Sequence, residues 1–308
     1  MHKIFIDGSA GTTGLRLESR LRQRGDITLL TLPEQYRKAP EARREKLNEA
    51  DAAMLCLPDA AALEAVAMVQ NPDTVIIDAS TAHRTNPGWA YGFPELSAEY
   101  REHIRQSKRI AVPGCHASGF IALVHPLVKA GILLHDALLH CVSVTGYTGG
   151  GNAMIASYES DDRARGDALH IPKQYALEQT HKHLPEMTAI AGLTSPPAFC
   201  PIVADFPRGI ELTIPLHRAQ IGASRGGIIE CYEAAYQNAA AVKVFADIAA
   251  MPALACHDTL HISVAGNEDR LLLVARLDNL GKGASGAAVQ CLNLALGAEE
   301  AESLIIDE

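Results

Sequence analysis

The chain has 308 residues, which is enough for two domains of ordinary size. Hydrophobic residues make up 48% and charged residues 20%, the balance of a globular protein with a full core. The net charge of −9 argues against electrostatic binding to nucleic acid or to an anionic membrane surface.

The first third of the chain alternates between strand-like and helix-like segments. Short apolar runs predict strands at 3–7, 27–32, 52–57 and 74–78. The segments between them predict helices at 15–24, 41–49 and 60–69. This alternation predicts a Rossmann-type α/β domain, with a doubly wound parallel sheet and right-handed crossovers, over residues 1–114.

After about residue 115 the strand-like segments are closer together and more alternating. They lie at 138–145, 211–215, 227–232, 261–265 and 270–277, and a last helix is predicted at 287–296. The pattern predicts a second, α+β domain over residues 115–280, followed by a C-terminal segment at 281–308. Two uncharged stretches, 110–128 and 137–158, are interrupted by prolines or glycines, so we do not expect them to span a membrane.

The first predicted strand ends in a glycine-rich turn with the sequence DGSAGTTG. Gly8, Gly11 and Gly14 have the spacing GxxGxxG, with a strand before them and a helix after them. Glycines at such a turn let the backbone approach a pyrophosphate at the positive end of a helix. We therefore expect a dinucleotide at this turn; the alternative is a tight turn without a ligand.

The second predicted strand ends without the acidic residue that NAD-binding domains commonly place there to bind the ribose. Arg37 and Lys38 follow shortly after it. Two cations in this position favour the 2′-phosphate of NADP, although a solvated loop is the alternative.

Cys115 stands in the segment PGCHASG, between a short predicted strand (109–112) and an apolar predicted helix (120–128). Unpaired amides and the helix dipole at a helix start lower the pKa of a thiol. A thiolate is the form that attacks an acyl carbon, so we expect Cys115 to be a nucleophile. The other six cysteines are expected to be buried by packing, as reduced thiols in the cytoplasm.

The segment HKHLPE gathers His181, His183 and Glu186. In an extended chain the two histidines point the same way. They suit a general acid or base that a carboxylate orients. A polar loop and a metal site are the alternatives, but no third ligand with suitable spacing follows.

Two arginines and one further glycine-rich segment carry candidate ligand contacts. The guanidinium groups of Arg84 and Arg208 suit a phosphate or a carboxylate, or else form surface ion pairs. The segment DNLGKGASG at 278–286 precedes the last predicted helix. It either binds the cofactor or is a tight turn.

Eight motifs of the chain resemble, in the same order, those of the N-acetyl-γ-glutamyl-phosphate reductases. They are GSAGTTG, DASTAHR, YGFPEL, VPGCHASG, GYTGGG, HKHLPE, PRGI and DNLGKGASGAAVQ. The resemblance is to the short form of the family and covers nearly the whole chain. The PGC segment alone would also fit the related aspartate-semialdehyde dehydrogenases, whereas HKHLPE with YGFPEL points to the acetylglutamyl enzyme.

The resemblance implies an enzyme of arginine biosynthesis that uses NADPH to reduce an acyl phosphate, N-acetyl-γ-glutamyl phosphate, to the semialdehyde and releases inorganic phosphate. It also implies a catalytic α+β domain that carries the dimer contact, a C-terminal helix that returns to the Rossmann domain, and a cytoplasmic homodimer or homotetramer. No metal, nucleic acid or membrane is implied.

The resemblance and the patterns above together give the predicted site residues. Cys115 would be the nucleophile, with His181 or His183 as the acid/base and Glu186 beside them. The cofactor would contact Gly8, Ser9, Gly11, Thr12, Thr13, Gly14, Arg37, Lys38, Ser80, Asn279, Gly283 and Gly286. The substrate would contact Arg84, His116, Tyr147 and Arg208.

Three other activities fit parts of the pattern. One is a semialdehyde dehydrogenase for aspartyl or aminoadipyl substrates. Another is a cysteine or metal hydrolase that uses Cys115 with a histidine and no nicotinamide, which leaves the glycine turn unexplained. The third is a nucleotide sensor that binds NADPH without forming an acyl adduct.

Overall fold

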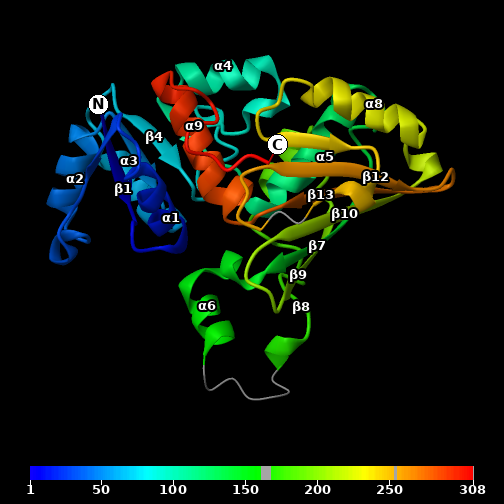
Figure 1. Cartoon of the computed structure of the whole chain (residues 1–308), viewed down its shortest axis with the longest axis horizontal. Helices are drawn as coiled ribbons and strands as arrows, with labels where there is room; N and C mark the ends of the chain where they lie inside the picture. Colours follow the sequence, from blue (N-terminus) through cyan, green and yellow to red (C-terminus); the bar gives the residue numbers. More distant parts are fainter. Residues whose placement is uncertain (161–167, 253–254, 308) are drawn as a thin grey trace. The chain divides into compact units, whose positions relative to one another are not determined.

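A computed structural model describes residues 1–160, 168–252 and 255–307 of the chain, which fold into two compact units (Figure 1). Unit 1 comprises Met1–Pro94, Ala98–Pro113 and Ala284–Leu304. Unit 2 comprises Glu95–Ser97, Gly114–Gly283 and Ile305–Glu308. Each unit has its own sheet and its own core.

Unit 1 is built on a parallel sheet with the order β2-β1-β3-β4-β6-β5 among the described residues. Its strands are β1 (His2–Asp7), β2 (Ile27–Leu30), β3 (Ala52–Leu55), β4 (Val75–Asp78), β5 (Ala90–Tyr91) and β6 (Arg109–Ala111). Its helices are α1 (Thr12–Leu21), α2 (Pro40–Glu49), α3 (Asp59–Met68), α4 (Ala98–Gln106) and α9 (Gly286–Leu296). The strand order reverses at β1, and doubly wound sheets bind ligands beyond the carboxyl ends of the strands at such a reversal.

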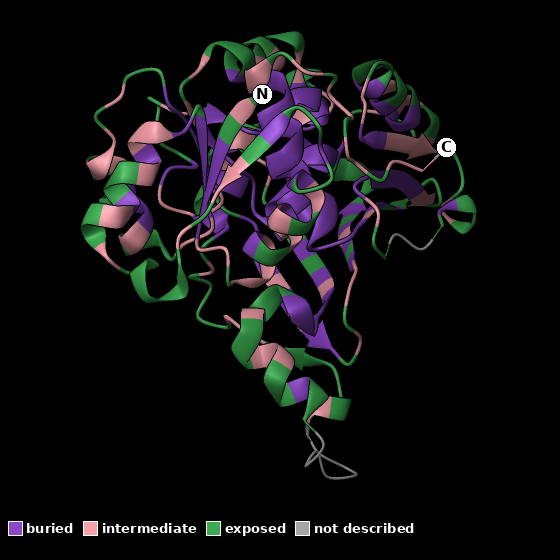
Figure 2. Ribbon diagram, turned by 60° about the vertical axis from the view of Figure 1, so that its left-hand side comes forward, coloured by how far each residue is buried: buried purple, intermediate pink, exposed green. Residues whose placement is uncertain are grey.

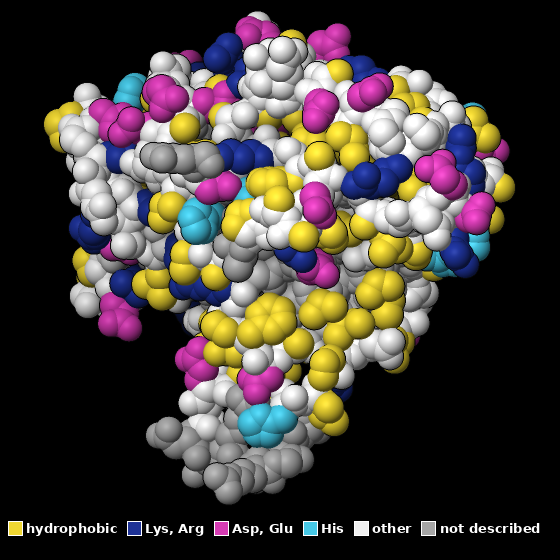
Figure 3. Space-filling view, turned by 45° about the vertical axis from the view of Figure 1, so that its right-hand side comes forward, with side chains coloured by type: hydrophobic (Ala, Val, Ile, Leu, Met, Phe, Trp, Pro, Cys, Tyr) yellow, Lys and Arg dark blue, Asp and Glu magenta, His cyan; other side chains and the backbone are white. Residues whose placement is uncertain are grey.

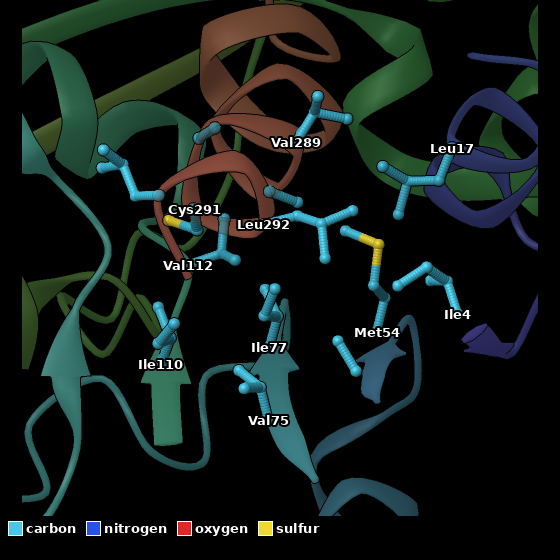
Figure 4. Packing of buried hydrophobic residues seen from close by; sticks show 14 of the residues in the cluster. Ile4, Leu17, Met54, Val75, Ile77, Ile110, Val112, Val289, Cys291 and Leu292 are labelled. Atoms are coloured by element: carbon cyan, nitrogen blue, oxygen red, sulfur yellow. The ribbon is translucent and has the colours of Figure 1, made fainter. Parts of the chain in front are cut away.

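The core of unit 1 lies on both faces of this sheet. On one face, Ile4 and Met54 pack with Leu292 of α9 (Figure 4). On the other face, Phe5 and Leu55 pack with residues of α2 and α3. Because both faces are covered, alternate residues of a strand point to opposite cores, and the central strands β3 and β4 are buried along their whole length.

Unit 2 contains a mixed sheet with the order β11-β12-β13-β10-β7-β9-β8 in the described part of the chain. Its strands are β7 (His140–Gly146), β8 (Lys173–Gln174), β9 (Ala198–Ala204), β10 (Ile210–His217), β11 (Val242–Phe245), β12 (Leu260–Gly266) and β13 (Arg270–Leu277). Its helices are α5 (Cys115–Lys129), α6 (Gly151–Glu159), α7 (Leu184–Ala191) and α8 (Arg225–Tyr236). The pairs β11–β12 and β7–β9 are parallel, and the other neighbours are antiparallel.

One face of the mixed sheet is covered by helices. Helix α5 packs against β10, β12 and β13, helix α8 packs against β11 and β12, and α7 packs against α5. Along β10, buried residues alternate with exposed or half-buried ones, as expected for a strand with one covered and one open face. Figure 2 shows α5 and the strands mainly buried, and α6 mainly exposed.

The segment 227–232 is helical, so the strand predicted there is wrong. Helix α8 begins after Ser224, whose side chain accepts a hydrogen bond from the Gly227 amide at 3.2 Å. Buried Ile228, Tyr232 and Tyr236 recur every four residues and form one helix face. Within a window of six residues, the isoleucines and the tyrosine favour a strand. Over the longer segment, the four-residue spacing of the buried side chains indicates a helix.

Short segments complete the chain. The 3₁₀ helices are η1 (Glu34–Tyr36), η2 (Pro94–Leu96), η3 (Tyr147–Gly150), η4 (Ala168–His170), η5 (Arg218–Gln220) and η6 (Ile248–Ala250), and η7 (Gly281–Ser285) is a π-helical turn. Among the residues that the structure describes, no helix combines the length and the apolar character needed to cross a membrane.

Candidate active site

The glycine-rich turn of unit 1 joins β1 to α1, and two of its glycines are required by close contacts. Gly8 has a φ of +88°, and a Cβ there would lie 2.3 Å from the Cys56 carbonyl oxygen. A Cβ on Gly14 would lie 2.5 Å from the Gly8 carbonyl oxygen. Gly11 is the N-cap of α1, and no side chain caps this helix. The turn therefore presents backbone close to the positive end of a helix, the arrangement that binds phosphate groups.

A cavity of about 480 Å³ lies beside this turn within unit 1. Asp7 at its base receives hydrogen bonds from Arg43, the shortest at 2.9 Å, and burial nevertheless raises the pKa of the Asp7 carboxyl. Arg37 and Lys38 also line the cavity, and neither side chain forms an ion pair with a described residue. The cavity thus has two cations that form no ion pair with a carboxylate of the described residues, which suits a phosphorylated ligand.

Ser80 and Arg84 lie at the carboxyl end of β4, where both are buried. The Ser80 hydroxyl donates to Asp78 Oδ2 at 2.6 Å, and His83 Nδ1 lies 2.7 Å from the same oxygen. Arg84 Nε donates to the Val112 carbonyl at 2.8 Å, and Arg84 Nη2 donates to the Ala79 carbonyl at 3.1 Å. The alternative of a surface ion pair for Arg84 is therefore wrong, because its guanidinium is buried against carbonyls at the ends of β4 and β6.

Cys115 is the first residue of α5, so the helix begins at the cysteine rather than at residue 120 as predicted. Gly114 is the N-cap and no side chain caps the helix. The first helical hydrogen bond runs from the Ser118 amide to the Gly114 carbonyl at 2.8 Å. The half-buried Cys115 therefore stands at the positive end of the helix dipole, where negative charge on a thiol is stabilised.

Glu186 lies on α7 and is 1% exposed. Its Oε2 accepts a hydrogen bond from the Gly114 amide at 3.1 Å. The carboxylate therefore holds Gly114, the residue that precedes Cys115. This contact links the HKHLPE segment to the PGC segment, as expected if both belong to one site.

Three imidazole rings gather around His116, the residue that follows Cys115 in sequence. The ring of His116 lies 5.7 Å from those of His181 and His183, and the latter two are 4.7 Å apart. The His183 amide donates to His181 Nδ1 at 3.1 Å, so neutral His181 carries its proton on Nε2. His183 is 4% exposed, whereas His181 is half-buried. Within the described residues, no group of three or more metal-ligating side chains is placed to hold a metal ion.

Comparison with known proteins relates these residues to a known family. A family model described as "Semialdehyde dehydrogenase, dimerisation domain" matches residues 115–279, and one described as "Semialdehyde dehydrogenase, NAD binding domain" matches residues 32–107. The N-acetyl-gamma-glutamyl-phosphate reductase 2 of Pseudomonas putida is 47% identical over 97% of this chain and 98% of that protein. This chain belongs to the N-acetyl-gamma-glutamyl-phosphate reductase family.

Other relatives and solved structures agree with this membership. The N-acetyl-gamma-glutamyl-phosphate reductase of Burkholderia cenocepacia is 46% identical over 97% of this chain and 98% of that protein. The structure of aspartate semialdehyde dehydrogenase II from Vibrio cholerae, complexed with ASA, covers 96% of this chain and 98% of that chain, with a TM-score of 0.73 and 14% identity. The predicted family and fold, a Rossmann-type unit followed by an α+β unit, are confirmed.

A nicotinamide dinucleotide, the cofactor of this reductase family, fits the residues of unit 1. A side chain at Gly8 or Gly14 would collide with the backbone of Cys56 or of the turn itself, so only glycine allows the tight turn that a pyrophosphate-binding loop needs. Arg37 and Lys38 line the adjoining cavity, near the end of β2. Ser9 lines the same cavity, and Thr12 and Thr13 are the first two residues of α1.

His116 has a buried ring whose two nitrogens are both engaged. Nδ1 lies 2.8 Å from Ser143 Oγ, and Nε2 lies 2.8 Å from Tyr175 Oη. Burial, and secondly the neighbouring His181, lower the pKa of His116 to about 3, so the ring is neutral. Burial, and secondly the charge of Cys115, raise the pKa of Tyr175.

No sequence motif singles out Tyr175 or Ser143. Tyr175 follows a two-residue strand, and only the tertiary structure brings its hydroxyl to His116. Ser143 lies in β7, where the other buried side chains are those of Cys141 and Thr145, so a small polar residue there does not stand out in the sequence. Its inward position in the alternation of β7 was the one available signal.

Tyr147 is engaged within unit 2. Its ring stacks on Tyr158 with centroids 4.7 Å apart, and its hydroxyl donates to Glu159 at 3.1 Å. Both tyrosines belong to a small apolar cluster with Val203. The ring therefore attaches α6 to the sheet.

Arg208 lies in a loop that Asn279 connects to the GYTGGG segment. Asn279 Oδ1 accepts from the Gly209 amide at 2.9 Å, and its Nδ2 donates to Thr148 Oγ1 at 3.0 Å. The Thr148 hydroxyl donates to the Pro207 carbonyl at 2.6 Å. Asn279 is 1% exposed, so it joins these loops from inside the protein.

Gly283, in the turn at Gly281–Ser285, packs against Cys115. A Cβ on Gly283 would lie 2.8 Å from the Cys115 Cβ and 3.2 Å from its Cα. Lys282, in the same turn, forms an ion pair with Glu95 at 2.7 Å, and both side chains are fully buried. Gly286 follows as the first residue of α9, in unit 1.

The prediction that the other six cysteines are buried by packing is wrong for Cys256. This residue is exposed and has a φ of +72°, because its amide turns inward to donate to Asp278 Oδ2 at 2.6 Å. Arg208 Nη1 donates to its sulfur at 2.9 Å. By contrast, burial raises the pKa of Cys56 to about 12 and also raises that of Cys141, so these two thiols are not nucleophilic near neutral pH.

Proposed function

We propose that this chain reduces N-acetyl-γ-glutamyl phosphate to the 5-semialdehyde with NADPH and releases inorganic phosphate, through a thioester on Cys115. The observation that carries the proposal is the placement of Cys115 at the uncapped start of α5, with Glu186 on the preceding amide. Family membership supplies the substrate, because the curated relatives are named for this acyl phosphate.

The first half of the reaction forms the thioester. His181 takes the thiol proton of Cys115, and the sulfur attacks the acyl carbon. The oxygen of that carbon gains negative charge, which the amides at the start of α5 stabilise. The bond from carbon to the phosphate oxygen then breaks, and phosphate leaves with the electron pair and takes up a proton from solvent.

The second half releases the aldehyde. The chemistry that a bound nicotinamide supplies is the delivery of a hydride to the acyl carbon. The carbon–sulfur bond then breaks, and protonated His181 returns its proton to the sulfur of Cys115. This restores the resting thiol and the neutral imidazole.

We assign the acid/base role to His181 rather than to His183. The His183 amide fixes the His181 ring by donating to Nδ1, which leaves Nε2 to exchange the proton. His181 is half-buried, whereas His183 is 4% exposed and less able to meet a substrate. Glu186 then holds the Gly114–Cys115 turn rather than acting on the proton.

We further propose a homodimer formed through the open face of the sheet in unit 2. Val142 and Leu272 are 38% and 40% exposed on strands β7 and β13, and exposed Pro215 is paired with Leu272. Hydrophobic side chains also lie side by side over one area of the surface in Figure 3. The matched family model is described as a dimerisation domain. An apolar sheet face of this kind fits a second copy of the chain.

Phosphate-dependent oxidation of the aldehyde tests the proposed function. The purified chain is mixed with NADP⁺ and N-acetylglutamate semialdehyde, with and without inorganic phosphate, and NADPH formation is followed. We expect sustained turnover only with phosphate. Faster turnover with aspartate or aminoadipate semialdehyde would contradict the substrate assignment, and an inert protein that binds NADPH would indicate a nucleotide sensor.

A further inference from the structure

Helix α2 carries an arginine on the face that packs against the sheet of unit 1. Arg43 and Leu47 are the buried residues of this helix, and they lie one turn apart. Leu47 belongs to the apolar core that contains Phe5 of β1. Arg43 lies nearer the start of α2, and its side chain is 10% exposed. An arginine this deeply buried requires a hydrogen-bonded partner.

Asp7, the last residue of β1, is that partner. Arg43 Nε donates to Asp7 Oδ1 at 3.3 Å and to Oδ2 at 3.0 Å, and Arg43 Nη2 donates to Oδ2 at 2.9 Å. This pairing uses one edge of the guanidinium group and both oxygens of the carboxylate. No described residue accepts a hydrogen bond from the third nitrogen, Nη1. Arg43 is thus held in one orientation with a charged donor left over.

The remaining donor is accessible to a ligand. Nη1 of Arg43 is neither hydrogen-bonded within the described chain nor shut off from solvent. Arg43 lines the cavity of about 480 Å³ beside the glycine turn, as Arg37 and Lys38 do. Because nine-tenths of the Arg43 side chain is buried, its small accessible part opens on this cavity. The cavity therefore has a cation whose position is fixed before any ligand binds.

The strand register places this donor beside the end of β2. Phe5 of β1 pairs with Leu30, the last residue of β2, in a parallel ladder. Asp7 is two residues further along β1, so it lies level with residue 32, just past the end of β2. Dinucleotide-binding domains read the 2′ position of the ribose here, with a carboxylate for a hydroxyl or an arginine for a phosphate. Asp7 does not fit the first role, because both of its oxygens accept from Arg43.

We propose that Arg43 is a specificity-determining residue whose Nη1 donates to the 2′-phosphate of NADPH. The inference rests on the proposed function only in taking NADPH as the ligand of unit 1. A phosphate monoester is doubly charged near neutral pH, so its hydrogen bond to a guanidinium group is strong, whereas NADH offers only a hydroxyl. Arg37 and Lys38 are exposed and must be ordered when they bind, whereas Arg43 is already ordered by Asp7.

Binding of the two cofactors to the substrate-free chain measures this contribution. Isothermal titration calorimetry gives the dissociation constants of NADPH and NADH, and their ratio is the preference for NADPH. We expect Arg43→Gln to lower this preference by about 10- to 100-fold, through weaker binding of NADPH alone, the effect of losing one hydrogen bond to a charged group. Adenosine 2′,5′-bisphosphate and adenosine 5′-monophosphate should show the same change, because they differ in the same phosphate.

Two other arginines of unit 1 provide matched controls. Arg44 is the next residue of α2 and is exposed, so Arg44→Gln removes the same charge without altering the lining of the cavity. Arg24 is 2% exposed and pairs with Asp26 at 2.6 Å, before the start of β2, so Arg24→Gln breaks a buried contact away from the cavity. Both control variants should keep the preference of the parent chain.

A second variant guards against a loss of folding. Arg43→Gln leaves Asp7 buried without its cation, whereas Asp7→Asn with Arg43→Gln replaces the ion pair by two neutral amides and should show the same loss of preference. Thermal unfolding establishes which variants are folded. An unchanged preference in a folded variant, or an equal loss of affinity for NADPH and NADH, would overturn the proposal. Because binding requires no acyl phosphate, the expected change in a chain without reductase activity would contradict the proposed function and leave the role of Arg43 standing.

Discussion

Gly283→Ala places one methyl group against the nucleophile. The added carbon would lie 2.8 Å from the Cys115 Cβ, 3.2 Å from the Cys115 Cα and 3.1 Å from the Asp278 carbonyl oxygen. Nonbonded carbons pack at about 3.5–4.0 Å, so the turn or the cysteine must move by about 0.7–1.2 Å. The carbonyl and the Cα are both backbone, and the clash is therefore not relieved by rotating a side chain.

The displacement sets the expected size of the effect. A misplacement of about 1 Å at a reacting group lowers the rate about 100-fold, so we expect kcat to fall by about 10- to 100-fold. Overpacking should lower the free energy of unfolding by about 1–3 kcal/mol. The dissociation constant of NADPH should stay unchanged, because the methyl group meets Cys115 and not the glycine turn of unit 1.

The assay is phosphate-dependent NADP⁺ reduction, with NADPH binding followed by fluorescence and stability by urea unfolding. Gly226→Ala is the matched control in the same unit, since its Cβ would meet only Ser224 Oγ at 3.9 Å. That change should keep kcat and stabilise α8 by about 0.5–1 kcal/mol. An unchanged kcat in Gly283→Ala, or a loss confined to NADPH affinity, would refute the packing role and favour the cofactor role that the motif suggested.

Three further predictions follow from the geometry. The double variant Arg37→Ala with Lys38→Ala should bind NADPH about 10- to 100-fold more weakly and NADH as before, as measured by fluorescence titration. An equal loss of affinity for NADPH and for NADH would contradict a contact with the 2′-phosphate. Lys282→Met leaves Glu95 buried without the cation of its ion pair, so the free energy of unfolding in urea should fall by about 3–5 kcal/mol. The double variant Lys282→Met with Glu95→Leu should recover most of that free energy. A double variant as unstable as Lys282→Met would contradict the ion-pair account. The pKa of His116 is about 3 in the folded chain, against 6.5 for an exposed histidine such as that of the unfolded chain. Its contribution to stability is thus present above pH 6.5 and falls by about 1.4 kcal/mol per pH unit below it. The His116→Gln variant should lack that slope, and equal slopes in urea unfolding from pH 6.5 to pH 4.5 would contradict the assignment.

Local patterns were sufficient to predict the glycine turn and the position of Cys115 beside a helix start. The requirement for Gly8 and Gly14 arises from contacts with a few neighbouring residues and the next strand, which a strand–turn–helix motif already implies. Cys115 likewise takes its chemistry from the helix start, although the apolar run suggested that the helix begins five residues later. The parallel sheet was predictable because its strands are short, apolar and separated by helices.

The rest of the site depends on contacts between distant segments. Tyr175 and His116 are 59 residues apart, and nothing near either one in sequence indicates that they meet. The same is true of Lys282 and Glu95, which are 187 residues apart. The error at α8 had a different cause, because β-branched and aromatic residues favour a strand unless the window is long enough to show the helical period.

A single turnover without phosphate tests the thioester most directly. The chain is mixed with NADP⁺ and N-acetylglutamate semialdehyde in phosphate-free buffer, and the protein is then quenched in acid and digested for mass spectrometry. We predict a burst of about one NADPH per active site, with the N-acetylglutamyl group on the peptide that contains Cys115, and neither burst nor label in Cys115→Ser. A burst without an acyl group on Cys115, or a full burst in Cys115→Ser, would contradict the central claim.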